Sequence, residues 1–297
     1  MPAARFALHV GGISLAAAFL FSGPAAAASP AVAAASAGTA AAAASAETAA
    51  TGSARSAGPA VHHGIVPPKH PRRNVQPRPN FLQSASCIGG KDGPGCNTMA
   101  RKAITRGRRI LERMRGMSFS MAAYEKLTPV EQLFVTVNLE RTSRGLAPAA
   151  VLVRRLNRAA QAGANQVRDP VFRLGAQPGG WTAISFGGNW AGGYDNALGS
   201  DFGWMYDDGL GSPNLDCTKA HRAGCWGHRD NILGTYATPR LCGGRRHELA
   251  MGAGHVRRSK KIHADSETEL FVGVCGPQPT GVVLSWARAR KLIHAGG

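Results

Sequence analysis

An alanine-rich stretch near the start of the chain sets the strongest limit on which part can fold. Residues 29–60 are mostly Ala, Ser, Thr and Gly. Such a composition buries too little apolar surface to offset the conformational entropy lost on folding. Residues 61–80 are Pro-rich and basic, which is typical of an extended linker. We therefore expect residues 29–98 to form a disordered Ala/Ser-rich and Pro/basic linker, with the globular domain at residues 121–297.

The first 28 residues have the pattern of a secretory signal peptide. Arg5 precedes an apolar stretch over residues 6–21, and three alanines at residues 26–28 offer a cleavage site before Ser29. No apolar run after residue 30 approaches the roughly 20 residues that a membrane-spanning helix needs. We expect residues 1–28 to be removed, leaving a secreted, extracellular protein without a transmembrane segment, free or held at the cell envelope. The alternative is an uncleaved membrane anchor.

Six cysteines support export, because disulfides persist in oxidising compartments. Their connectivity does not follow from sequence alone. Proximity favours two short loops, Cys87–Cys96 and Cys217–Cys225, whose Gly, Pro and Asn residues let the ends meet at modest entropic cost. This leaves Cys242 to pair with Cys275. A zinc site is the weaker interpretation, because the chain has no C-x-x-C pair.

Residues 99–120 predict a basic amphipathic helix before the domain. Part of the chain's formal net charge of +18 is concentrated here. Apolar residues recur on one helical face, and the basic residues opposed by Glu112 alone are Arg101, Lys102, Arg106, Arg108, Arg109, Arg113 and Arg115. Such a helix binds an anionic envelope polymer or a membrane, or is simply solvated. Export, and the lack of any nucleic-acid motif beyond charge, argue against nucleic acid as a partner.

The rest of the chain reads as helices followed by strands. Thr128 and Glu131 have capping-box spacing around Pro129, which predicts a helix that ends near Gly145. Further helices are expected over residues 150–167 and 196–206, with a Gly/Trp-rich loop at 179–193 between them. Short strand-like segments follow at residues 248–256, 269–275 and 282–289. Without βαβ alternation, this order predicts an α+β fold with a small antiparallel sheet.

Three motifs resemble those of the bacterial CAP superfamily, the SCP-like extracellular module. The stretch 137–148 (VNLERTSRGLAP) resembles the N-x-x-R…G-L-x-P pattern of its first helix. Residues 227–233 (GHRDNIL) resemble its G-H-R-x-N-I-L segment, and Gly252-Ala253-Gly254 resembles the G-x-G strand that follows. The resemblance covers roughly residues 125–290. It implies an α-β-α sandwich, with a three-stranded antiparallel sheet between helix layers and a cleft on one face.

The resemblance also implies a cleft with two His and two acidic residues, of which this chain retains part. His228 matches the second His, and Asp207, three residues after Trp204, stands where one acid is expected. Gly188 occupies the position of the other acid, and residues 168–174 contain no His where the first is expected.

Our candidate cleft residues are His228, Asp207, Asn189, Trp190 and Trp226. Each also has a structural interpretation: a helix cap for His228, a helix C-terminal turn for Asp207, a loop hydrogen bond for Asn189 and packing for the tryptophans. One His and one Asp are too few to hold zinc, so we expect no metal or cofactor. Ser185 and Ser200 are possible nucleophiles, but neither lies in a G-x-S-x-G motif or beside a His.

Three functions remain open. The first is a non-catalytic, monomeric secreted domain that binds a lipid, a glycan or an anionic envelope polymer through a degenerate cleft. The second is a secreted hydrolase that uses His228 with Asp207, which requires both residues to share one open cleft. The third is an interaction protein that acts through its basic N-terminal tail. We expect the first, and therefore not an enzyme.

Overall fold

The computed structural model describes residues 70–294 except residues 86, 88–93 and 221–223. The expected signal at 1–28 and most of the linker lie outside the described residues. The α-helices are α1 (Pro94–Glu112), α2 (Met121–Tyr124), α3 (Pro129–Thr142), α4 (Arg154–Gln166), α5 (Ala197–Tyr206), α6 (Gly227–Leu233) and α7 (Trp286–His294). A 3-10 turn, η1 (Phe81–Gln83), precedes them. The strands are β1 (Ala149–Val153), β2 (Gly175–Ala176), β3 (Thr182–Gly192), β4 (His247–Ser259), β5 (Ala264–Cys275) and β6 (Val282–Ser285).

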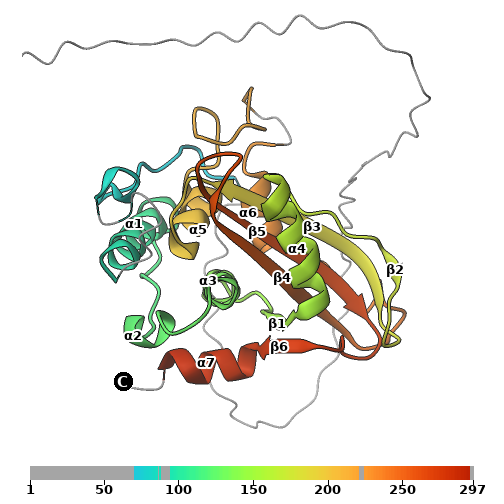
Figure 1. The fold of residues 1–297 in the computed structure, drawn as a ribbon. Helices are drawn as coiled ribbons and strands as arrows, with labels where there is room; N and C mark the ends of the chain where they lie inside the picture. Colours follow the sequence, from blue (N-terminus) through green and yellow to red (C-terminus); the bar gives the residue numbers. More distant parts are fainter. Residues whose placement is uncertain (1–69, 86, 88–93, 221–223, 295–297) are drawn as a thin grey trace, which may run out of the picture. The chain divides into compact units, whose positions relative to one another are not determined.

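The strands form one mixed six-stranded sheet in the order β2-β3-β5-β4-β1-β6 (Figure 1). Strand β1 runs parallel to β4, and every other neighbouring pair is antiparallel. The fold is α+β, but the expected small three-stranded antiparallel sheet is wrong. Three strands, β1, β2 and β3, were not predicted: the apolar run of β1 resembles the start of the following helix, β2 has only two residues, and the glycines of β3 resemble a loop. The expected strand at residues 282–289 ends at Ser285, and the residues after it form α7.

Helices cover both faces of this sheet. Helix α4 packs on one face against β4 and β5. Glycine makes this contact close: a Cβ on Gly254 would lie 2.5 Å from the backbone nitrogen of Gln161, so only glycine lets the helix backbone come so near β4. Helices α3, α5 and α7 lie on the other side with the larger apolar core, which includes Phe134, Phe202 and Met251.

Helix α3 begins at its predicted capping box and is tied to β1 and α6 by buried polar side chains. The Glu131 carboxylate accepts hydrogen bonds from the backbone N–H and the hydroxyl of Thr128, at 2.9 and 2.8 Å. The Asn138 amide group is buried and forms paired hydrogen bonds with the backbone of Ala149, which joins α3 to β1. The Arg141 guanidinium donates to the carbonyls of Ile232 (2.6 Å) and Gly234 (2.9 Å) at the end of α6. The first and second motifs therefore meet in one packed body.

Helix α1 packs into the same body, against α5. Two of its charged residues are buried: Arg108 pairs with Glu140 of α3 at 2.7 Å, and Glu112 pairs with Arg144, just after α3, and with Arg229 of α6. Other basic residues of the segment, such as Lys102, Arg109 and Arg113, are exposed. The basic segment is thus partly a solvated surface and partly a core element.

All three expected disulfides are present: Cys87–Cys96, Cys217–Cys225 and Cys242–Cys275. The last joins the segment before β4 to the end of β5, whereas the first two close short loops. Within the part of the chain that the structure describes, no helix has both the length and the apolar character needed to cross a bilayer.

Candidate functional site

A cavity of about 390 Å³ opens where α4, β3, α5 and the loop between α5 and α6 meet. Its lining combines carboxylates and an imidazole with aromatic and aliphatic side chains. Its lining residues are Val167, Arg168, Asp169, Trp190, Ala191, Gly192, Tyr194, Gly203, Trp204, Asp207, Asp208, Pro213, Asn214, Leu215, Asp216 and His228.

The central polar contact is a hydrogen bond between His228 and Asp208. The imidazole Nδ1 lies 2.6 Å from Asp208 Oδ1, and the His228 backbone N–H donates to Oδ2 at 3.2 Å. Both side chains are largely buried. Burial lowers the pKa of His228, but the hydrogen bond and charge of Asp208 outweigh it, so the pKa lies above its ordinary value. For Asp208, burial raises the pKa, and the hydrogen bonds and charge of His228 only partly oppose that rise.

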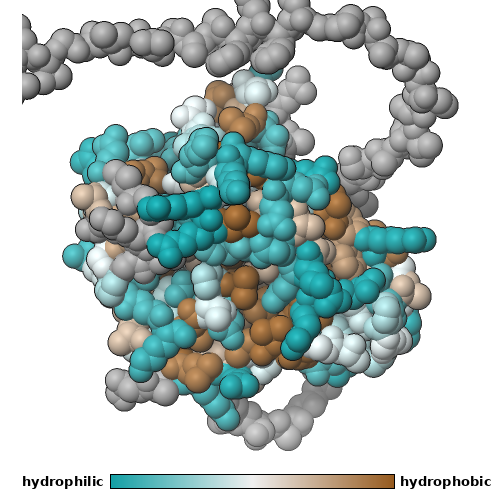
Figure 2. All heavy atoms as spheres, in the orientation of Figure 1, coloured by the Kyte–Doolittle hydropathy of each residue, from teal (hydrophilic) through white to brown (hydrophobic). Residues whose placement is uncertain are grey.

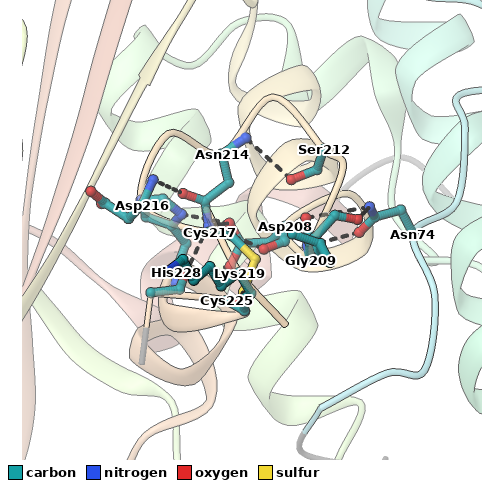
Figure 3. Close-up of a disulfide and its surroundings, with 12 residues drawn as sticks. Asn74, Asp208, Gly209, Ser212, Asn214, Asp216, Cys217, Lys219, Cys225 and His228 are labelled. Atoms are coloured by element: carbon teal, nitrogen blue, oxygen red, sulfur yellow. Dashed lines mark hydrogen bonds and ion pairs between the residues drawn. A yellow bond between two sulfur atoms is a disulfide. The ribbon is translucent and has the colours of Figure 1, made fainter. Parts of the chain in front are cut away.

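The loop that carries Asp208 is held by side-chain amides on two sides (Figure 3). The Asn214 side chain donates to Asp208 Oδ1 at 2.7 Å and to the Gly224 carbonyl at 2.9 Å. Asn74, which lies in the segment that we assigned to the linker, accepts from the Gly209 N–H at 2.7 Å and donates to the Leu210 carbonyl at 2.9 Å. Such bonds fix the carboxylate before any ligand arrives, which favours a built site over a mobile loop.

Two further carboxylates approach His228. One oxygen each from Asp169 and Asp216 and one ring nitrogen of His228 lie within 4.8 Å of one another. Because Nδ1 is engaged by Asp208, Nε2 is left for a ligand. Burial raises the pKa of Asp169, partly opposed by the charge of His228. Two carboxylates and an imidazole oriented by a third carboxylate are a set that can hold a divalent cation with positions open to solvent.

Asp207 lines the same cavity but does not form the expected pair with His228; Asp208 does. Asp207 caps the C-terminal end of α5, directly after Tyr206. Its Oδ1 is buried without a hydrogen-bond partner among the described residues. Burial, and secondly the charge of Asp208, raise its pKa to about 6. A buried acceptor without a partner is costly, so this oxygen favours a ligand that brings a donor.

The apolar wall contains Trp190, Trp204 and Tyr194. The indole N–H groups are used within the protein: Trp190 donates to Ser266 Oγ at 2.9 Å, and Trp204 donates to the Trp190 carbonyl at 3.1 Å. The ring surfaces thus contribute apolar contact area, which suits the hydrophobic part of a ligand or the face of a sugar ring.

Asn189 and Trp226 support the cavity instead of lining it. The buried Asn189 amide donates to Glu269 Oε1 (2.6 Å) and to the His228 carbonyl (3.0 Å). Trp226 packs on the Cys217–Cys225 disulfide, and its left-handed backbone (φ 64°) places α6 directly after it. A non-glycine residue in this region is strained and persists only where its surroundings hold it.

The possible nucleophiles also lie elsewhere. Ser185 Oγ donates to the Tyr236 carbonyl at 2.6 Å, and the fully buried Ser200 hydroxyl bonds Glu267. At Gly188, where the resemblance implies an acid, a Cβ would lie 2.7 Å from the Pro170 ring. The missing acid is therefore matched by a proline packed over its position.

Sequence reasoning missed Asp169, Asp208 and Asp216. Asp169 lies in the stretch 168–174, where the resemblance implies a His and not an acid. Asp208 adjoins Asp207, and Asp216 adjoins Cys217 at the start of the disulfide loop. The usable signal was the excess of Asp around a short disulfide loop that leads directly into His228.

No model of a known protein family, no curated protein and no solved structure matches this chain.

Proposed function

We propose that this chain is an exported, CAP-like domain that binds a ligand in the cavity around His228 without chemical conversion. The resemblance draws support from Arg141, which ties the first motif to the end of the second within one body. Export draws support from the three disulfides and the signal pattern. The observation that carries the binding function is the buried Asp207 oxygen without a partner in a preformed cavity beside the Asp208–His228 pair.

The charges of the cavity favour a cationic or hydroxyl-rich ligand over an anionic one. Four aspartates line it against Arg168 and His228. An anionic envelope polymer would be repelled from this interior, although a glycan, with hydroxyl donors and a ring face, fits both walls.

A divalent cation fits the mouth of the cavity. Asp169, Asp216 and His228 Nε2 would hold it, and Asp208 would orient the imidazole. Bound there, the cation would supply a Lewis-acidic centre that fixes a hydroxyl or carbonyl oxygen of the ligand.

A covalent nucleophile is lacking, because the described lining residues include no Ser, Thr or Cys, so hydrolysis here would need an activated water. The hydrolase alternative required His228 and Asp207 to share one cleft, and both line this cavity, but the imidazole is hydrogen-bonded to Asp208 and not to Asp207. The alternative that the tail acts alone concerns residues mostly outside the described part of the chain.

The test is calorimetric titration with Zn²⁺ and Mn²⁺ of the chain and two matched variants. Asp216→Asn should weaken binding at least about tenfold, since it removes one of three ligands. Asp230→Asn, the same change on the same face but outside the cluster, should leave affinity within about twofold. Native mass spectrometry of the secreted protein should then show a co-purified metal or a small donor-bearing ligand. No metal binding in the unmodified chain, or equal effects of both variants, would reject the cation site; an empty cavity in the secreted protein would reject ligand binding.

A further inference from the structure

The end of β4 and the turn between β4 and β5 present a cluster of cations. Arg257, Arg258, Lys260 and Lys261 are all exposed within five residues. The turn has a defined shape, because the buried Asp265 carboxylate accepts from the Arg258 N–H at 2.8 Å and the His263 N–H donates to the Ser259 carbonyl at 2.8 Å. The side chains therefore project from a fixed hairpin.

The loop between α5 and α6 presents exposed leucines. Leu210 is 53% exposed and Leu215 is 79% exposed. A single exposed leucine needs no explanation, but two on a loop held by Asn74 and Asn214 are a fixed apolar projection.

These two features border the same cavity. Leu215 and Gly192 both line it. On the hairpin side, Ile262 lies against Gly192 and Trp190, where a Cβ on Gly192 would come within 2.9 Å of Ile262 Cδ1. Figure 1 shows the β4–β5 turn and this loop at the same end of the described body. Figure 2 shows hydrophobic side chains among hydrophilic ones where the loop projects.

We propose that this end of the molecule, the hairpin cations together with Leu210 and Leu215, is a docking surface for bilayers that contain anionic phospholipids. Cations bind headgroup phosphates, and leucines beside them enter the headgroup–acyl boundary. A soluble anionic polymer would use the cations and leave the leucines in water. A second copy of the chain would bring the same cations face to face, and the N-terminal tail is itself basic.

The cations and the acidic cavity lie at the same end of the molecule but on different residues. An anionic bilayer is therefore attracted to the hairpin and is not drawn into the cavity. Docking would place the cavity mouth at the membrane and does not depend on which ligand the cavity takes.

The contribution of the hairpin cations to vesicle binding is tested by co-sedimentation of the chain without residues 1–28. The vesicles are phosphatidylcholine alone, or phosphatidylcholine with about one-third phosphatidylglycerol. The Lys260→Glu/Lys261→Glu variant should lose at least about tenfold in affinity for the anionic vesicles, since each cation at such a surface contributes about fivefold. The control, Arg290→Glu/Lys291→Glu, makes the same charge change on exposed positions of α7 and should lose less than about threefold. Both variants keep the basic tail, so its background is common to both.

The apolar half is tested at high salt, where charge attraction is screened. Leu215→Ser should lower the vesicle affinity that remains at high salt by at least about fivefold. Leu241→Ser, at a position 62% exposed, should not lower it by that amount. Equal losses in test and control variants, or equal binding to both vesicle types, would overturn the proposal. So would binding of soluble polyphosphate without vesicle binding, which would assign the surface to a polymer.

Discussion

At the scale of single residues, His228 is subject to two opposing influences on its pKa. Burial lowers the pKa, and Asp208 raises it by a hydrogen bond and by charge, with a net rise. Asp208→Asn removes the charge while it keeps the side-chain size. We therefore expect the His228 pKa to fall in this variant, because burial is then opposed only by the charges of Asp169 and Asp216. A ¹H–¹⁵N NMR titration of the imidazole measures it.

The control for that titration is His255, which also pairs with an aspartate, Asp265, at 3.2 Å. Its titration should not change in Asp208→Asn. An unchanged His228 pKa would show that the 2.6 Å contact does not carry the electrostatic effect.

Sequence reasoning named part of the site at this scale. His228, Asp207 and Trp190 line the cavity, whereas Asn189 and Trp226 lie behind it. Asp169 and Asp216 were missed because they come to His228 through the end of α4 and through a disulfide loop, and the path of a loop has no local pattern. Only the excess of Asp around that disulfide loop indicated them.

At the scale of elements, α1, α3 and α6 are joined by buried charges. Glu112 lies between the guanidinium groups of Arg144 and Arg229, and all three side chains are inaccessible. Glu112→Ala leaves two buried cations without this partner. Removing one member of a buried pair typically costs about 3–5 kcal/mol. We expect a loss of that size in the free energy of unfolding, measured by urea denaturation.

Lys102→Ala provides the comparison, since Lys102 is exposed on the same helix. Its effect should stay within about 0.5 kcal/mol. A similar small loss for Glu112→Ala would show that α1 is peripheral, as the sequence had suggested for a solvated basic helix.

The elements that sequence predicted well are those with local signals. The capping box set the start of α3, and Asn196 caps α5 through the Gly199 N–H at 2.7 Å. Strand β3 was missed because Gly187 and Gly188 break its pattern. Because these glycines have no side chain, Asn231, Tyr236 and Pro170 can pack directly against the strand. Such a tertiary contact leaves no pattern in the local sequence.

At the scale of the whole molecule, two of the three disulfides should differ in how much they stabilise the fold. Cys242 and Cys275 are 33 residues apart, whereas Cys217 and Cys225 are 8 apart. Loop entropy predicts that removing Cys242–Cys275 costs about 3–4 kcal/mol in the free energy of unfolding, and that removing Cys217–Cys225 costs about 2.5 kcal/mol. Paired Cys→Ala variants in urea denaturation should follow this order. The short disulfide adjoins Asp216, so its removal should also weaken cation binding, which the long one should spare; the reverse pattern would contradict this assignment.

The pH dependence of stability follows from buried carboxyl groups in opposite situations. Burial raises the pKa of Asp201 and Glu269 well above ordinary values, and that of Asp207 to about 6. A raised carboxyl pKa means that the folded state holds the proton more tightly. The contribution of such a group to the free energy of unfolding is therefore complete below about pH 4, its pKa in the unfolded chain. It is lost as the pH rises through its pKa in the folded state.

Glu140 acts in the opposite direction. Burial would raise its pKa, but Arg108 and Arg144 outweigh burial and lower it. Its contribution is present above the unfolded value of about 4.3 and is lost only as pH falls through the lowered value. The two kinds of group thus favour the folded state together between about pH 4 and 6.

We therefore expect a higher Tm at pH 5 than at pH 8 in about 0.15 M salt, measured by scanning calorimetry. Asp201 is the sharpest probe, since both of its carboxylate oxygens are buried without a hydrogen-bond partner among the described residues. Asp201→Asn removes the charge at nearly constant volume, so it should flatten the fall in Tm above pH 5. A Tm that rises from pH 5 to pH 8 would mean that lowered carboxyl groups such as Glu140 and Asp265, not the raised ones, dominate the folded state.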